Sequence, residues 1–155
     1  MIENQISNKT GMNKSMTKPA RWFYVVAALA LIWNVMGVMA YISQIMMSPE
    51  MLLKMPTAEQ ELFNAIPYWA DVAFACAVFS GVFASLALLL KRDWAIALFF
   101  LSLLGALIQM YHAFFMSNSL EVYGLEGMIM PLMIIIIASL LLWLAFIAKK
   151  RDWLI

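Results

Sequence analysis

Four apolar stretches dominate the chain, at residues 22–47, 69–90, 94–116 and 127–148, and none of them contains a lysine or an arginine. Each is long enough to cross the hydrocarbon core of a bilayer, which is roughly 30 Å thick and needs about 20 helical residues. A water-soluble domain cannot accommodate a chain that is 65% hydrophobic and 12% charged, because a large share of its residues must face water. With only four spans, we expect helices, because each helix satisfies its own backbone hydrogen bonds within lipid. The sequence therefore predicts an all-α membrane protein with four transmembrane helices in an up-down bundle.

The basic residues lie on one side of these spans. Nine of the ten precede the first span, separate the second from the third, or follow the fourth, and Lys54 is the exception. Because basic loops stay in the cytoplasm, we expect both termini to be cytoplasmic in a bacterial inner membrane. Residues 1–20 form a polar arm that we expect to be disordered, and residues 21–155 form the transmembrane domain. The net charge of +1 gives no reason to expect a nucleic-acid partner.

A charged and aromatic hexamer occurs twice, as "KRDWAI" at 91–96 and "KRDWLI" at 150–155, each time directly after a span. Lysine, arginine and tryptophan anchor a helix end at the membrane interface, and two copies suggest that a helical hairpin was duplicated. A shift of 68 residues supports the duplication by aligning polar and glycine positions of the first and third spans: Asn34 with Ser102, Gly37 with Gly105, Tyr41 with Gln109, and Gln44 with His112. The sequence thus predicts two parallel repeats.

The loop between the first two spans has helix-start signals. Ser48, Pro49 and Glu50 are typical of a capped helix start, and Thr57 with Gln60 matches a capping box. We therefore expect short interfacial helices within residues 49–65. Methionines gather in the same region, and thioethers can bind Cu(I), but methionine is also a common flexible apolar residue. We favour the second interpretation and expect no metal site.

Polar side chains within the spans are the candidate ligand-binding residues, because lipid does not tolerate them unless they face the bundle or a cavity. The stripes of the first and third spans repeat at i, i+3, i+7 and i+10, so each lies on one helix face. If the stripes face each other, they line a polar recess open to the outer side and rimmed by Glu121, Tyr123 and Glu126. The alternative is that these groups hydrogen-bond across helices as packing. The candidates are Asn34, Tyr41, Gln44, Trp69, Asp71, Gln109 and His112.

Catalytic and cofactor chemistry finds little support in the sequence. The single histidine cannot supply two imidazoles to a haem, and "GLEG" at 124–127 lacks the lysine and hydroxyl of a phosphate-binding loop. No serine lies in a nucleophile motif. We therefore expect neither an enzyme nor a bound cofactor.

The segments "LIWNVMGVMAYISQ", "PYWADVAFACAVFSGVFASLALLLKR", "WAIALFFLSLLGALIQ" and "EVYGLEGMIMP" resemble a group of small bacterial inner-membrane proteins that carry the name "sugar transporter". The likeness runs from about Lys18 to Ile155. The overall plan also resembles the DoxX-like four-helix membrane proteins. The first resemblance implies a multi-pass membrane protein that moves a sugar-like solute. The Pro-Gln loop of the small SWEET-type sugar carriers does not occur here.

Three functions stay open at this point. A transporter or ligand-binding protein for a small polar solute ranks first, and it would need a homodimer because four packed helices leave little room for a path. An accessory or structural subunit of a larger membrane complex is the second, with small-residue helix faces binding another membrane protein and the polar stripes serving as packing. A quinone-linked redox membrane protein, with His112 and Asp71 near a head group, is the third.

Overall fold

The computed structural model describes residues 18–155, and all secondary structure in that range is helical. Four helices within this range are long and apolar enough to cross a membrane, which indicates a membrane protein. They are α2 (Arg21–Ile45), α5 (Tyr68–Leu89), α6 (Ala95–Tyr111), which continues as the π-helix η1 (His112–Met116), and α8 (Ile129–Lys150). The apolar stretches of the sequence predict these four helices. Of the predicted polar arm at 1–20, residues 1–17 lie outside the described residues.

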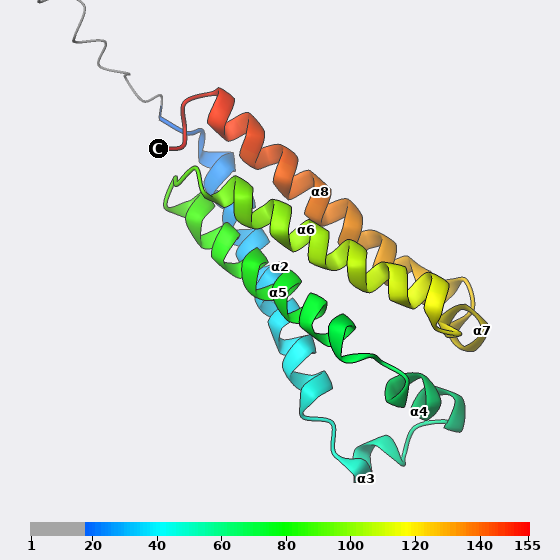
Figure 1. Ribbon diagram of the computed structural model, residues 1–155. Coiled ribbons are helices and arrows are strands. Elements are labelled where there is room, and N and C mark those ends of the chain that lie inside the picture. Colours follow the sequence, from blue (N-terminus) through cyan, green and yellow to red (C-terminus); the bar gives the residue numbers. More distant parts are fainter. Residues whose placement is uncertain (1–17) are drawn as a thin grey trace, which may run out of the picture.

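The long helices pack in the order α2, α5, α6, α8, and consecutive ones run in opposite directions (Figure 1). α5 and α6 form the centre, with α2 against α5 and α8 against α6. We call the end that carries Lys91, Arg92, Lys149, Lys150 and Arg151 the basic end. The opposite, loop end carries α3 (Pro49–Leu52), α4 (Thr57–Asn64) and α7 (Ser119–Tyr123), followed by the 3-10 turn η2 (Glu126–Met128).

Small residues allow α5 and α6 to approach closely. A Cβ atom built on Gly105 would lie 2.8 Å from the carbonyl oxygen of Ala73 and 3.0 Å from the amide nitrogen of Ala77. The hydroxyl of Ser102 donates to the carbonyl oxygen of Ala77 at 2.7 Å. Such contacts are typical of membrane helices, which associate through close packing and interhelical hydrogen bonds. The predicted small-residue stripe of α5 is buried: Ala73, Ala77, Ser80, Ala84 and Ala87.

The hydrophobic core lies toward the basic end, where all four long helices contribute buried side chains. Phe23, Leu88, Phe99 and Trp153 are among its large members. The Trp153 ring contacts the Phe23 ring edge-on at a centroid distance of 5.3 Å, which joins the chain after α8 to the start of α2. The basic end is therefore densely packed.

The two copies of the hexamer end their helices at different positions. Both helices end in a Schellman motif, closed around a residue with positive φ, Lys91 (57°) after α5 and Asp152 (53°) after α8. Lys91 opens its hexamer and Asp152 is third in its own, so α8 extends two residues further into the repeated sequence. The tryptophans differ as a result: Trp94 is 47% exposed and Trp153 is 5% exposed. The predicted interfacial anchor is therefore wrong for Trp153, which is a core residue.

The two hexamers also bind each other. The amide of Asp93 donates to the carbonyl oxygen of Ile155 at 2.9 Å, and the amide of Ile155 donates to the carbonyl oxygen of Lys91 at 2.7 Å. Lys149 Nζ lies 3.4 Å from Asp93 Oδ2. An exposed ion pair of this kind contributes little, so the backbone bonds are what hold the end of α8 against the α5–α6 turn.

The loop between α2 and α5 contains two short helices. Ser48 caps α3 by accepting a hydrogen bond from the amide of Met51 at 3.2 Å, as the Ser-Pro-Glu pattern predicts. The predicted capping box is wrong, because α4 begins one residue earlier than the box requires. Pro56 takes the N-cap position, Thr57 is already helical, and Gln60 Nε2 donates to the carbonyl oxygen of Met55.

Candidate functional site

A cavity of about 270 Å³ lies at the loop end, and we call it the loop-end recess. Residues of α2, α4, α5, α6, η1 and α7 line it, so it lies where the long helices meet the layer of short ones. Its polar lining residues are Gln44, Glu59, Asp71, Gln109, His112, Ser117, Ser119 and Tyr123. Four of the seven candidates from the sequence, Gln44, Asp71, Gln109 and His112, therefore share one cavity.

Gln44 and Asp71 join α2 to α5 at the recess. Gln44 Nε2 donates to Asp71 Oδ1 at 2.6 Å, and both residues are half-buried. A hydrogen bond to a carboxylate is stronger than one between neutral groups, so this pair fixes the orientation of both side chains. The amide oxygen of Gln44 and the second carboxylate oxygen of Asp71 keep their capacity to accept hydrogen bonds.

Gln109 and His112 bring the third span to the same cavity. His112 is 8% exposed, and its ring meets the Trp69 ring edge-on at a centroid distance of 5.5 Å. Among residues 18–155, neither the Gln109 nor the His112 side chain makes a hydrogen bond, and their polar atoms keep some accessible surface. Buried polar groups normally have partners. The amide and the imidazole are thus free to bind a molecule within the recess.

The backbone changes form at His112. α6 ends at Tyr111, and residues His112–Met116 continue as a π-helix, closed by a hydrogen bond of 3.0 Å from the Ser117 amide to the His112 carbonyl oxygen. Single π turns are rare and are frequent at functional sites. The wider turn is where the third span passes from the packed bundle into the wall of the recess.

Tyr123 and Glu59 form the part of the wall nearest the short helices. Burial raises the pKa of the Tyr123 hydroxyl, and the neighbouring Glu59 carboxylate raises the same pKa further. Tyr123 therefore stays protonated around neutral pH and presents a hydrogen-bond donor. Of the three predicted rim residues only Tyr123 lines the recess, while Glu121 and Glu126 do not.

Glu59 is a lining residue that the sequence analysis missed. Together with Ile66, which lies just after its end, its helix α4 lines the recess with residues spaced i, i+3, i+4 and i+7, namely Glu59, Leu62, Phe63 and Ile66. This spacing marks one face of a helix. The pattern is readable in the sequence, and applying it to the loop helices would have identified Glu59.

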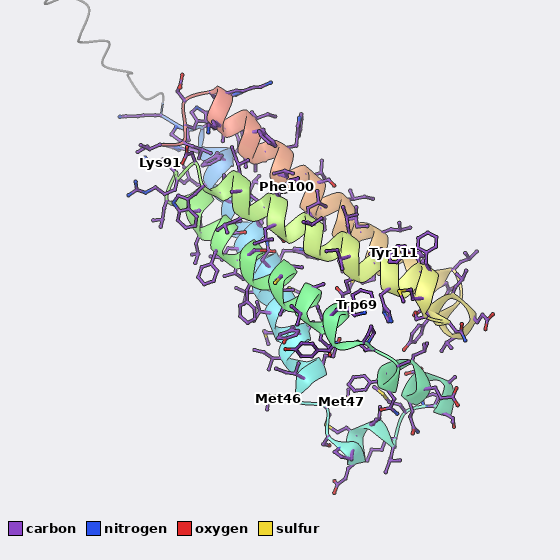
Figure 2. The ribbon with its side chains drawn as sticks, viewed as in Figure 1. Met46, Met47, Trp69, Lys91, Phe100 and Tyr111 are labelled. Atoms are coloured by element: carbon purple, nitrogen blue, oxygen red, sulfur yellow. The ribbon has the colours of Figure 1, made fainter. Side chains whose placement is uncertain are left out.

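The remaining three candidates lie at different distances from this cavity. Trp69 is 41% exposed and touches the site through His112, and Figure 2 shows it between α5 and the end of α6. Tyr41 does not line the recess, because its ring packs edge-on against Phe74 at 5.5 Å and against Phe79 at 6.1 Å.

Asn34 lies deeper in the bundle and serves packing. Its Nδ2 donates to the carbonyl oxygen of Ala30 at 2.8 Å and to the hydroxyl of Ser85 at 3.2 Å. The side chain lies directly over Gly81, next to Ser102. The polar stripe of α2 thus has two environments. Its first member, Asn34, packs against α5, and its last, Gln44, lines the recess.

The methionines near the end of α2 differ in their surroundings. Met55 lines the recess, whereas Met46 and Met51 are 72% and 56% exposed. Figure 2 shows Met46 and Met47 at the turn after α2, away from Trp69.

The chain was compared with known protein families, proteins and structures. No protein-family model, no curated protein and no solved structure matches the chain.

Proposed function

We propose that this chain is a multi-pass protein of the bacterial inner membrane that binds a small, uncharged, hydroxyl-bearing solute of the sugar type in the loop-end recess and carries it across the membrane. The observation that supports this most directly is the open hydrogen-bonding capacity of Gln109 and His112 around a cavity of about 270 Å³. That volume is just below the range of roughly 300–1,000 Å³ of drug-sized ligand pockets, which suits a small solute.

The chemistry of the lining favours a hydroxyl-rich and uncharged molecule. Amide and imidazole groups both donate and accept hydrogen bonds, as sugar hydroxyls do. The carboxylates of Asp71 and Glu59 accept hydrogen bonds from hydroxyls and disfavour an anion by like charge. The Trp69 ring beside His112 adds an aromatic surface. Among uncharged solutes, the resemblance to small proteins named "sugar transporter" favours a sugar.

The charge distribution supports an outward-facing recess. Nine of the ten basic residues precede α2, lie between α5 and α6, or follow α8, and the positive-inside rule then orients the basic end to the cytoplasm. The recess is at the opposite end, and the basic end is filled by buried side chains such as Phe23, Phe99 and Trp153. This arrangement corresponds to the outward-open state of a carrier, with both termini in the cytoplasm.

The alternative role of an accessory subunit has one binding surface fewer. Of the small-residue faces proposed for it, α5 buries the stripe of the second span within its own bundle. A homodimer remains part of the transporter proposal, because the four helices alone offer only a short path.

Transport assays with recess variants test the proposal. Purified protein in lipid vesicles should take up one member of a panel of labelled hexoses and pentoses in a saturable manner. Gln44→Ala and Gln109→Ala should each weaken apparent affinity about fivefold, since a lost hydrogen bond of about 1 kcal/mol corresponds to that factor. Ser43→Ala is the matched control, because Ser43 is exposed on α2 and bonds only to its own helix. Uptake that both glutamine variants leave unchanged would remove the recess from the mechanism.

A further inference from the structure

A second cavity of about 260 Å³ lies between α2 and α8, with α5 and α6 as its floor, and we call it the lateral groove. The start of α2 meets the chain after α8 at the basic end, where Phe23 contacts Trp153, and farther along α2 and α8 each pack on a different central helix. Trp33, Met36 and Ala40 of α2 face Met130, Ile134 and Ala138 of α8 across the groove. Met36 and Met130 are each 57% exposed, so the groove opens sideways, toward the hydrocarbon of a bilayer.

The walls of the lateral groove are almost entirely apolar. Asn34 and Ser102 are among its lining residues, but their side chains already bond to Ala30, Ser85 and Ala77. Gln109 also lines the groove, and its amide has no hydrogen-bond partner among the described residues. The groove thus offers a chain-shaped apolar surface with the open amide of Gln109 at its margin.

Gln109 lines both cavities and so marks their junction. The polar recess is at the loop end, and the groove reaches Trp33 and Asn34 near the middle of α2, which runs from Arg21 to Ile45. Polar space near one membrane surface followed by apolar space toward the midplane is the layout of a lipid molecule in one leaflet. A free sugar would use only the recess.

We propose that the solute of the recess is the head group of a lipid from the outer leaflet, with an uncharged, hydroxyl-bearing head in the loop-end recess and one apolar chain in the lateral groove. This inference rests on the proposed function because it keeps the loop-end recess as the binding site, and it replaces the free sugar with a lipid that carries the hydroxyl-bearing group as its head. A chain in the groove gains little over a chain in the bilayer, because lipid tails are as apolar as the helix surface. Selectivity therefore comes from the head group, through Gln44, Gln109 and His112, while the chain determines the route of entry.

Photolabelling in vesicles tests both parts of the ligand. The probes are a glycerol-headed monoacyl lipid with a photoreactive chain, a photoreactive alkane without a head, and a labelled monosaccharide. The glycerol lipid should label peptides of α2 and α8 that border the groove. Ala40→Phe fills the groove, and labelling should fall by roughly fivefold or more, which corresponds to about 1 kcal/mol of steric overpacking. Ala28→Phe is the matched control, because Ala28 is also an exposed alanine of α2 and borders neither cavity.

Ala138→Phe fills the same groove from the opposite wall and gives a second variant if Ala40→Phe does not fold. Gln109→Ala should lower labelling by the glycerol lipid and leave labelling by the alkane unchanged. Equal labelling of Ala40→Phe and Ala28→Phe by the glycerol lipid would overturn the inference. Equal labelling of the groove by the glycerol lipid and by the headless alkane would overturn it too. Binding of the monosaccharide that depends on Gln109 but not on Ala40 would overturn the lipid and retain the polar solute. No Gln109-dependent binding of any probe would reject both proposals.

Discussion

Replacing Trp153 with alanine should destabilise the protein by about 3–5 kcal/mol, the range for removing a large aromatic side chain from a core. Trp153 is 5% exposed and contacts the rings of Phe23 at 5.3 Å and Trp22 at 5.8 Å. The Arg151 guanidinium lies 5.1 Å from the centre of its ring, a cation–π geometry. The loss should appear as a lower midpoint when the protein is unfolded with SDS in mild detergent and followed by circular dichroism.

Trp94→Ala is the matched control, because Trp94 occupies the same position of the other hexamer. It is 47% exposed and starts α6 as its N-cap residue, so its loss should cost about 1 kcal/mol or less, as for most surface substitutions. Equal losses in the two variants would mean that the hexamers play equivalent roles, contrary to the two-residue difference in where their helices end.

Gly105→Ala should also destabilise the protein, by about 1–3 kcal/mol, although alanine is intrinsically the better helix former by about 1 kcal/mol. The added Cβ would lie 2.8 Å from the Ala73 carbonyl oxygen and 3.0 Å from the Ala77 amide nitrogen. These are backbone atoms, which move only if α5 moves as a whole. The same SDS titration measures the change, and the separation of α5 and α6 should also weaken the Ser102–Ala77 hydrogen bond.

Gly37→Ala provides the comparison on α2. There the nearest atom to an added Cβ is a methyl group of Val78 at 3.1 Å, a side chain that can adjust by a small rotation. We expect this variant to be close to neutral or slightly more stable than the parent. A Gly105→Ala protein as stable as the parent would show that α5 and α6 are not in backbone contact.

The four long helices could be predicted because apolar length alone determines them. The choice of neighbours could not, since α2 exposes apolar side chains on most of its surface, including Leu29, Met36 and Met39, each more than half exposed. The polar stripe of α2 indicates which face of the helix is buried but not which helix covers it, and lipid offers no hydrophobic drive to bring helices together. The close approach at Gly105 and the position of Asn34 over Gly81 depend on which helices become neighbours, so the sequence did not predict them.

The candidate site could be predicted only in part. Polar groups at one helical spacing identified Gln44, Gln109 and His112, and the structure puts all three on one cavity. The spacing carries no information on depth, so it also included Asn34 and Tyr41, which meet α5 where the helices are packed. The internal duplication stays a prediction, since the repeated hexamers have different backbone forms.

The attachment of α8 at one end has a mechanical consequence. Backbone bonds from Ile155 to Asp93 and Lys91, together with the Trp153 contacts, hold its basic end in place. The helix has 22 residues and is roughly 33 Å long, so a tilt of about 5° about this pivot displaces its far end by roughly 3 Å. A displacement of that size, with α8 moving against α6, would widen or narrow the lateral groove beside Met130 while the contacts at the basic end stay in place.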